Sequence, residues 1–368
     1  MIWIRNLFKI TSYNFFIFFI LISLFFFASF IFNKINTNAE DNRSKLINYT
    51  DIKWADNHFQ EFGKLNTIYR DYFTWRREEY YGQTINIDKN GIRKSFSYEN
   101  DTNRNNISFL FFGGSAMWGT GSNDENTIPS LFAKKNKQKV INYGETGYNS
   151  IQSLNFLNTL IITNKINLDN KIVIFYDGVN NVSYNCQVKN SGLETTRAST
   201  LNKLIRDSST KNIRYYLRPF LDIFSSLKLA LRVDHDNKNY RNCDDNKEKA
   251  NIVATNLINT WVIARQIVEK NGGVFVPILQ PVIYIGDVKK DHLNYDLEPD
   301  LGRNFLSVYA LIKNKAKKIF GNKFIDLTDV FDDSSYYYID YCHYSPNGND
   351  IIADEITKEL KTTFKINL

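Results

Sequence analysis

The chain has 368 residues, which is enough to bury one or two large cores. Its residues are 43% hydrophobic, 15% aromatic and 23% charged, a composition typical of a globular protein that excludes a largely disordered one. The net charge of +7 is modest. The basic residues are scattered among acidic ones and form no basic face with interleaved aromatics, so nucleic acid is not an expected partner.

The first feature along the chain is an uncharged apolar segment, residues 14–32, whose length is sufficient to cross a bilayer as a helix. Arg5 and Lys9 precede it, which places the N-terminus in the cytoplasm by the positive-inside tendency. Residues 1–33 are therefore predicted to be a cytoplasmic tail and a single-pass anchor in the inner (cytoplasmic) membrane. The remaining chain is predicted to face the periplasm or the cell exterior.

A cleaved signal peptide is the alternative for this segment. Thr37, Asn38 and Ala39 loosely resemble a small-residue cleavage site. The apolar segment is longer than the roughly 7 to 15 residues of a signal-peptide core, so an uncleaved anchor is favoured.

Residues 34–104 form the second predicted region, a stalk with an edge hairpin. Residues 33–66 are polar and weakly periodic, which indicates a stalk or a short helix packed on the domain. Residues 72–95 contain the alternating stretch TINID between the turn signals GQ and NG. This pattern predicts a small hairpin at the edge of the following domain.

From residue 105 onward the pattern changes to short apolar runs that alternate with longer amphipathic segments. Such alternation is typical of βα units on a parallel sheet and predicts an α/β domain over residues 105–368. The predicted strands are residues 107–112, 139–143, 171–176, 273–279 and 323–328.

Residues 182–246 interrupt the alternation and are predicted to be a helical insertion. Residues 213–233 carry apolar residues at helical spacing within it. Ligands of such sheets bind at the carboxyl ends of the strands, so the insertion is either a lid over the substrate or a surface decoration.

Three cysteines limit the disulfide and metal chemistry. Cys186, Cys243 and Cys342 are too few for a disulfide scaffold and show no CxxC spacing for zinc. Outside the cytoplasm, Cys186 and Cys243 could form one bridge, although spacing alone does not fix connectivity. Cys342 could be read as a nucleophile, but a small, partly buried thiol is the more common role.

The glycine-rich stretch FFGGSAMWGTG, residues 111–121, follows the first predicted strand. It lacks the lysine of a phosphate-binding loop, and it contains neither GxGxxG nor GxSxG, because Met117 stands where the last glycine of GxSxG would be. What remains is Ser115 at the carboxyl end of a strand, in a turn made tight by Gly113 and Gly114. That is the position of a nucleophile.

A serine nucleophile needs a base, preferably one oriented by a carboxylate. Of the four histidines, only His343 has a suitable setting, because Asp340 precedes it by three residues. One imidazole nitrogen could contact Asp340 and leave the other for Ser115. Ser345 and Pro346 then indicate the cap and first turn of a helix. The apolar face predicted for that helix consists of Ile351, Ile352, Ile356 and Leu360.

Two further loops offer groups that could stabilise an oxyanion. Gly147 follows the second predicted strand, and Asn180 follows the third within a glycine turn. Glycine and asparagine are common in any loop, but a backbone amide and an amide side chain are the donors that acyl transfer requires. Their placement after successive strands, with His343 after the last, favours one shared site.

The order Ser115, Gly147, Asn180, His343 resembles the four blocks of the SGNH, or GDSL-type, hydrolases over about residues 105–360. Two positions depart from the usual pattern: Gly114 replaces an aspartate beside the serine, and Asn181 stands where an aspartate is frequent. The resemblance implies a flavodoxin-like α/β/α fold with about five parallel strands. It also implies the catalytic residues Ser115, His343 and Asp340, with an oxyanion hole formed by Ser115, Gly147 and Asn180.

The expected function is an extracytoplasmic serine esterase that removes O-acyl groups, O-acetyl groups in particular, from a carbohydrate or cell-envelope glycan. Two alternatives stay open: an O-acetyltransferase supplied by a membrane acyl-donor partner, and a non-catalytic glycan-binding module. No metal or organic cofactor is expected. Trp118 and the tyrosines at 336–338 are candidates for stacking on sugar rings.

Overall fold

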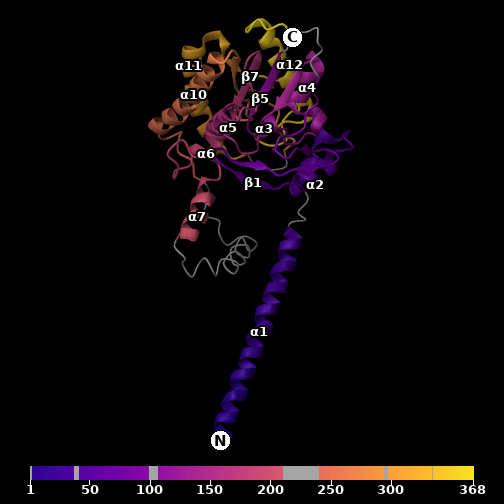
Figure 1. The fold of residues 1–368 in the computed structure, drawn as a ribbon, viewed down its shortest axis with the longest axis vertical. Coiled ribbons are helices and arrows are strands. Elements are labelled where there is room, and N and C mark those ends of the chain that lie inside the picture. Colours follow the sequence, from indigo (N-terminus) through magenta and orange to yellow (C-terminus); the bar gives the residue numbers. More distant parts are fainter. Residues whose placement is uncertain (1, 37–40, 99–106, 210–239, 294–296, 334) are drawn as a thin grey trace. The chain divides into compact units, whose positions relative to one another are not determined.

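The structure is a computed structural model that describes residues 2–36, 41–98, 107–209, 240–293, 297–333 and 335–368. The chain divides into two compact units (Figure 1). The first comprises Met1–Asp41 and Ile205–Asp236, and the second comprises Asn42–Leu204 and Asn237–Leu368. Each unit is described by itself.

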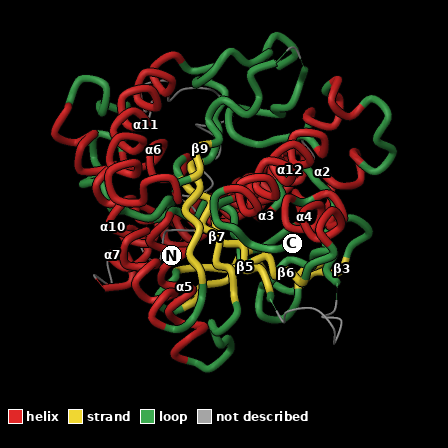
Figure 2. Tube along the Cα trace, turned by 90° about the horizontal axis from the view of Figure 1, so that it is seen from above, coloured by secondary structure: helices red, strands yellow, loops and turns green. Residues whose placement is uncertain are grey.

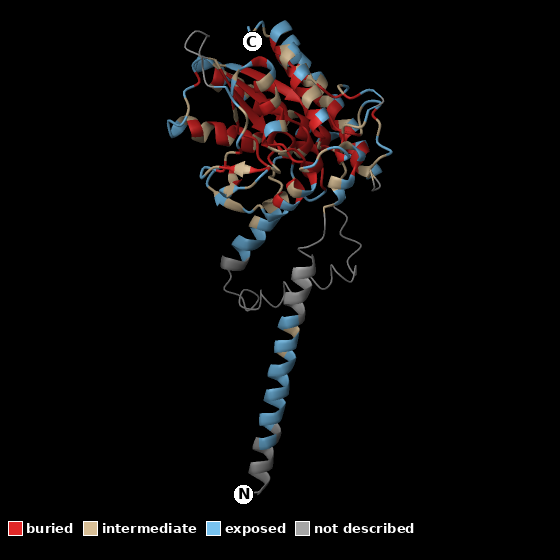
Figure 3. Cartoon of the chain, turned by 90° about the vertical axis from the view of Figure 1, so that its right-hand side faces the viewer, coloured by how far each residue is buried: buried red, intermediate tan, exposed pale blue. Residues whose placement is uncertain are grey.

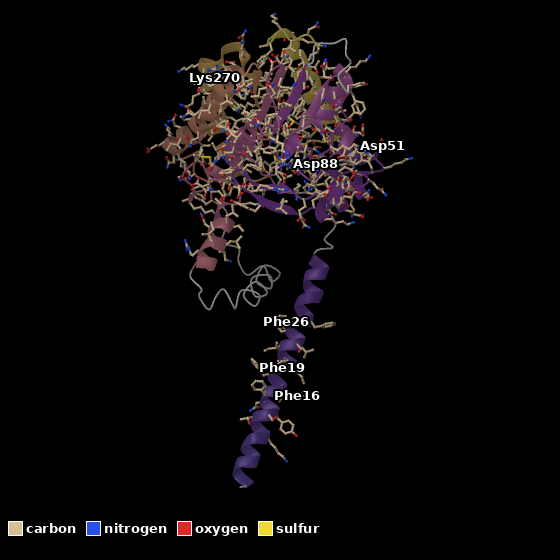
Figure 4. All side chains as sticks on the ribbon, viewed as in Figure 1. Phe16, Phe19, Phe26, Asp51, Asp88 and Lys270 are labelled. Atoms are coloured by element: carbon tan, nitrogen blue, oxygen red, sulfur yellow. A yellow bond between two sulfur atoms is a disulfide. The ribbon has the colours of Figure 1, made fainter. Side chains whose placement is uncertain are left out.

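In the first unit, α1 (Ile2–Asn36) is one continuous helix. Its described side chains are mostly exposed, and Phe16, Phe19 and Phe26 project from it (Figures 3 and 4). Within the part of the chain that the structure describes, no helix is both long and apolar enough to cross a membrane. The membrane span predicted for residues 14–32 is therefore not supported there. The side chains of residues 28–32 lie outside the described residues.

The second unit is built on a five-stranded sheet in the order β6-β5-β7-β8-β9. Every neighbouring pair in this sheet is parallel, which confirms the predicted α/β fold with five parallel strands. The strand bounds are β5 Ser108–Gly113, β6 Lys139–Asn142, β7 Lys171–Asp177, β8 Val274–Leu279 and β9 Ile325–Asp326.

Helices cover both faces of this sheet (Figure 2). Along β5, Leu110 and Phe112 belong to one buried cluster, whereas Phe109 and Phe111 belong to another, because successive side chains point to opposite faces. The first cluster includes residues of α5 (Ser150–Ile162), α10 (Lys247–Lys270) and α11 (Pro299–Phe320). The second includes residues of α4 (Ile128–Asn136) and α12 (Pro346–Thr362). Because both faces of the strands are buried, their sequences are continuous apolar runs rather than alternating ones.

The strand order places two loops of interest side by side. β5 lies between β6 and β7. After β5 the chain adds β6 on one side of it and then crosses to add β7 on the other side, so the order of the strands changes direction between β5 and β7. Ligands of open α/β sheets bind at this point, outside the carboxyl ends of the strands. Ser115 follows β5, and Asn180 follows β7 within α6 (Val179–Asn185).

The N-terminal part of the second unit is helical and packs against the rest of it. It comprises η1 (Asn42–Lys45), η2 (Ile47–Tyr49) and α2 (Ala55–Lys64). Leu46, Tyr49 and Phe59 share a buried cluster with Ile339, which precedes Asp340. The segment for which we predicted a stalk or a short packed helix is therefore a packed helical segment from Asn42 onward.

A small hairpin was predicted for residues 72–95; the structure has two antiparallel pairs over residues 67–87, and both are separate from the parallel sheet. β1 (Thr67–Arg70) pairs with β2 (Thr74–Arg77), and β3 (Tyr80–Tyr81) pairs with β4 (Asn86–Ile87). The first pair turns through Tyr72 and Thr74, which adopt positive φ without a glycine. Turn signals based on glycine and asparagine therefore missed it.

Part of the predicted insertion is described. It begins within α6 and includes α7 (Ala198–Ser209), whose residues from Ile205 onward belong to the first unit. Its base is closed by a Cys186–Cys243 disulfide, the one bridge that we considered. The segment predicted as helical, residues 213–233, lies outside the described residues. The remaining described helices of the unit are α3 (Ser115–Trp118), η3 (Asp124–Asn126) and η4 (Gly321–Lys323).

Candidate active site

Ser115 is the first residue of α3; Gly113 ends the strand β5, and Gly114 lies between the strand and the helix. Gly113 has a φ of 157°, and a Cβ added there would lie 2.5 Å from the Tyr176 carbonyl oxygen of β7. Only glycine allows so close an approach at this φ. The turn therefore keeps Ser115 at the carboxyl end of β5, where its side chain is partly exposed.

Buried Arg93 holds the loop that follows Ser115. Its guanidinium donates to the carbonyls of Trp118 (3.1 Å), Gly119 (2.7 Å) and Ser122 (2.5 Å), and its Nε donates to Asp124 Oδ1 (3.1 Å). The same guanidinium lies 4.2 Å from the centre of the Trp118 ring. Trp118 is fully buried. Our expectation that it could stack on a sugar is therefore wrong, because its faces are taken up by packing.

Asp340 and His343 lie in a tight turn between two residues that pair across it. Tyr338 forms an antiparallel bridge with Tyr344, and the Ile339 amide donates to the His343 carbonyl (2.9 Å). Asp340 Oδ1 accepts hydrogen bonds from the backbone amides of Cys342 and His343, both at 2.9 Å. The spacing of three residues thus orients the carboxylate by local backbone contacts.

The structure brings Ser115, His343 and Asp340 into one hydrogen-bonded row. His343 Nε2 lies 2.6 Å from Ser115 Oγ, and His343 Nδ1 lies 2.6 Å from Asp340 Oδ2. With the proton on Nδ1, the imidazole donates to Asp340 and accepts from the serine hydroxyl. This is the geometry that a serine nucleophile with a general base requires.

The carboxyl group of Asp340 is held in its ionised form. Burial alone would raise its pKa, but the nearby charge of His343, the hydrogen bonds from the His343 side chain and the Cys342 amide, and the charge of Arg43 together hold the pKa well below its usual range. Arg43 Nη1 lies 3.3 Å from Asp340 Oδ2. No signal in the sequence pointed to Arg43, because it stands 297 residues from its partner in a polar segment.

Asn180 lies beside the turn that carries Ser115, and a backbone carbonyl orients its amide. Its Nδ2 donates to the Tyr148 carbonyl at 2.7 Å, which leaves one N–H of the amide for another acceptor. A Cβ added at Gly114 would lie 2.6 Å from Asn180 Nδ2 and 3.1 Å from the Tyr148 carbonyl. The absence of a side chain at Gly114 therefore allows Asn180 to approach the serine turn.

Gly147 lies in the neighbouring loop, which the start of the insertion contacts. Its φ is 78°, and Thr196 Oγ1 donates to its carbonyl at 3.0 Å. Nearby, Asn149 Nδ2 donates to the Glu194 carbonyl at 2.9 Å. The described beginning of the insertion thus packs against one of the predicted oxyanion loops.

Cys342 fits neither a nucleophile nor a metal site in this arrangement. Burial, followed by the charge of Asp340, raises the pKa of its thiol well above the usual range, so the thiol stays neutral. Asp340, Cys342 and His343 could in principle offer ligands to a metal ion, since their ligand atoms lie within 4.8 Å of one another. Both His343 nitrogens, however, already contact Ser115 and Asp340.

Comparisons with known proteins give structural likenesses only. No family model and no curated protein matches the chain. Among solved structures it is similar to a carbohydrate acetylesterase family member from Sinorhizobium meliloti, with 12% identity and a TM-score of 0.40, covering 71% of this chain and 100% of that chain.

Two further solved structures have comparable similarity. A member of the lipolytic protein G-D-S-L family from Veillonella parvula has 11% identity and a TM-score of 0.38, covering 71% of this chain and 100% of that chain. The acetyl xylan esterase AlAXEase has 16% identity and a TM-score of 0.37, covering 68% of this chain and 98% of that chain.

Proposed function

We propose that the protein is a serine esterase that removes O-acyl groups, O-acetyl groups in particular, from a carbohydrate. The observation that carries this proposal is the row Ser115 Oγ, His343 and Asp340, with 2.6 Å between successive partners. The carbohydrate substrate rests on the resemblance of the four sequence blocks to SGNH hydrolases. No step of the reaction needs a cofactor.

In the proposed reaction, Ser115 Oγ forms a bond to the ester carbonyl carbon while its proton passes to His343 Nε2. Asp340 stabilises the imidazolium and holds its orientation. The carbonyl oxygen becomes an oxyanion, which the Ser115 and Gly147 amides and Asn180 Nδ2 would stabilise by about 3 to 4 kcal/mol per donor. His343 then protonates the leaving alcohol oxygen, and an acyl-enzyme is left.

The second half of the reaction repeats these roles with water. His343 takes a proton from the attacking water, and the water oxygen forms a bond to the acyl carbon. The bond from that carbon to Ser115 Oγ then breaks, His343 Nε2 returns the proton to Ser115 Oγ, and the carboxylic acid leaves. If a sugar hydroxyl attacks instead of water, the same residues perform O-acetyl transfer. The hydrogen-bonded row supports both outcomes equally, so transfer with a membrane acyl-donor partner stays the second candidate.

The test is hydrolysis of p-nitrophenyl acetate by the purified full chain, beside Ser115→Ala and His343→Ala. We expect wild-type turnover and a loss of about 10⁴-fold or more in each variant. Acetate release from an acetylated oligosaccharide, compared with acetyl transfer to an added glycan acceptor, separates the esterase from the transferase. A folded wild type that binds glycan but turns over neither substrate would instead favour the binding module.

We also propose an extracytoplasmic location for the second unit. The Cys186–Cys243 disulfide supports it, because such bonds persist mainly in oxidising compartments, and so does the uncharged segment at residues 14–32. Membrane anchoring by that segment stays part of this proposal. Protease treatment of intact spheroplasts tests it: we expect the second unit to be degraded, and full protection would contradict the proposed location.

A further inference from the structure

The N-terminal segment of the second unit contacts both loops of the candidate active site. Tyr49 Oη donates to the Gly121 carbonyl (2.5 Å), in the loop that follows α3. Asn48 Nδ2 donates to the Tyr336 carbonyl (2.6 Å), shortly before the turn that carries Asp340 and His343. Ile339, fully buried, packs in the same cluster as Tyr49. The segment therefore fixes these two loops relative to one another.

Within this segment, Arg43 contacts the acid–base pair itself. Its Nη1 lies 3.3 Å from Asp340 Oδ2, the same oxygen that His343 Nδ1 contacts at 2.6 Å. The guanidinium lies 5.0 Å from the ring centre of Phe59 and 5.6 Å from that of Phe62. Two aromatic rings of α2 thus restrict a cation whose side chain is only 24% exposed.

We propose that Arg43 is a positioning residue for the acyl-transfer reaction, acting through Asp340 on His343. The proposal rests on the proposed function, since it assigns Arg43 a task in the same site. It makes the N-terminal segment part of the active site rather than a stalk.

The contacts of the Asp340 carboxylate give the physical reason. Two backbone amides fix Oδ1, whereas Oδ2 contacts only His343 and Arg43 among the described hydrogen bonds and ion pairs. Without Arg43, Oδ2 would be held by His343 alone, and the orientation of the carboxylate would be less restricted. Arg43 also offsets part of the negative charge that faces His343, so Asp340 stabilises the imidazolium less strongly than an unpaired carboxylate would.

Exposed ion pairs usually contribute little, which is the alternative for Arg43. The pair with Asp340 differs from such pairs because both side chains are largely covered and the guanidinium is held by Phe59 and Phe62. Arg303 provides a contrasting pair. It bonds Asp244 at 2.9 Å, but its side chain is 59% exposed.

Among the described residues, the other titratable groups near this pair include Tyr341, Cys342 and His58. The neighbouring Cys342, burial and the charge of Asp340 raise the pKa of Tyr341 well above its usual value, so its hydroxyl stays neutral. The Cys342 thiol is kept neutral because burial and the charge of Asp340 raise its pKa. Burial and the charges of Arg93 and Arg43 lower the pKa of His58 in α2 well below its usual value, so it is neutral as well. Within the part of the chain that the structure describes, we therefore attribute the pH profile to the charges of Arg43, Asp340 and His343.

The experiment compares Arg43→Met and Arg43→Lys in the full chain, with Arg303→Met as the matched control. For p-nitrophenyl acetate we expect Arg43→Met to lower kcat about 10- to 100-fold with KM changed less than about twofold, because the base is misplaced rather than the substrate lost. Arg43→Lys keeps the charge and should recover most of kcat. Arg303→Met should match the wild type.

The pH profile separates positioning from simple packing. In Arg43→Met the uncompensated carboxylate stabilises the imidazolium, so the acidic limb of kcat/KM should move to higher pH by about half a unit to one unit. Arg43→Lys should keep the wild-type limb. An unchanged kcat and an unchanged limb in Arg43→Met would overturn the proposal.

A measurement that needs no turnover distinguishes a failure of this proposal from a failure of the proposed function. The proton between His343 Nδ1 and Asp340 Oδ2 should give a low-field proton resonance, absent in His343→Ala. We expect this resonance to shift or broaden in Arg43→Met but not in Arg303→Met. If it does so while the wild type hydrolyses no ester, the proposed function fails and the positioning role stands. If it is identical in Arg43→Met and wild type, the positioning role is wrong.

Discussion

Two aspartates near the carboxyl ends of the strands have opposite ionisation behaviour. Asp340 receives two backbone amides, His343 and Arg43, and its pKa is held well below the usual range despite burial. Asp177, the last residue of β7, receives only Trp261 Nε1 at 2.9 Å, and its Oδ1 has no partner among the described residues. Burial raises the pKa of Asp177 to about 7, against the lowering effect of that hydrogen bond.

The comparison shows that neighbouring positive charges and hydrogen-bond donors, more than depth alone, decide what an aspartate can do at this site. Asp340 stays a carboxylate and can stabilise an imidazolium. Asp177 is part of the structural support of β7, three residues before Asn180, and is protonated over much of the pH range in which Asp340 is ionised. The predictions below test this division.

The largest expected effect on activity follows from Asp340→Asn. The variant removes the carboxylate that fixes the proton on His343 Nδ1, so the imidazole can present the wrong tautomer to Ser115. We expect kcat for p-nitrophenyl acetate to fall by about 10⁴-fold while the protein stays folded. A fall of less than tenfold in a folded variant would contradict the role of Asp340.

Asn180→Ala should have the next largest effect. Loss of one oxyanion donor is expected to lower kcat by about 10²- to 10³-fold. The control is Asn181→Ala, because Asn181 is buried and its side chain bonds Ser150 rather than facing the serine turn. That variant should cost about 1 to 2 kcal/mol of unfolding free energy with little change in kcat. Equal losses of kcat in both variants would remove Asn180 from the oxyanion hole.

Gly114→Ala should have a smaller effect on activity. The backbone of Gly114 (φ −81°) suits alanine, so the cost comes from the Cβ, which must displace the Asn180 amide 2.6 Å away. We expect kcat/KM to fall about tenfold. The double variant with Asn180→Ala should be no slower than Asn180→Ala alone, because both changes remove one interaction. Additive losses would mean that Gly114 acts independently of Asn180.

Asp177→Asn should have the smallest effect on activity. Its main effect should be on how the free energy of unfolding depends on pH. Because the pKa of Asp177 is raised to about 7 in the folded protein, the folded state binds its proton more tightly than the unfolded state. The corresponding stability is present at low pH and is lost as pH rises from about 4 to about 7. Between pH 5 and pH 8, wild type should therefore lose about 2 kcal/mol relative to Asp177→Asn.

Chemical denaturation at these two pH values measures that difference. The expected kcat of Asp177→Asn at neutral pH is within about twofold of wild type, because the described hydrogen bonds of the Asp177 side chain go to Trp261 and to none of the three residues of the hydrogen-bonded row. A parallel pH dependence of the two unfolding free energies would show that Asp177 is ionised in the folded protein.

The sequence was sufficient to predict features that depend on local pattern. The five apolar runs all became parallel strands, although β9 is only two residues long. Ser345 caps α12 through a hydrogen bond from the Gly348 amide, as its place before Pro346 predicted. On that helix Ile352, Ile356 and Leu360 are fully buried, whereas Ile351 is only partly covered, so the predicted apolar face was one residue too wide.

Other features depend on contacts between distant residues, which a single sequence does not reveal. The pair of Arg43 with Asp340 joins the two ends of the second unit, and neither neighbourhood has a periodic signal that marks it. The burial of Trp118 depends on Arg93, which enters from the hairpin region. The spacing of Asp340 and His343 suggested a compact loop, but the contact of His343 with Ser115 needed the sheet to bring residues 228 positions apart together.

The most direct test of the central claim is covalent labelling of the full chain with a fluorophosphonate, followed by mass mapping of the modified peptide. The account predicts a single phosphonyl adduct on Ser115, formed much more slowly in His343→Ala and absent in Ser115→Ala. Labelling of a different residue, or no labelling of Ser115 in the folded wild type, would contradict the assignment of Ser115 as an activated nucleophile.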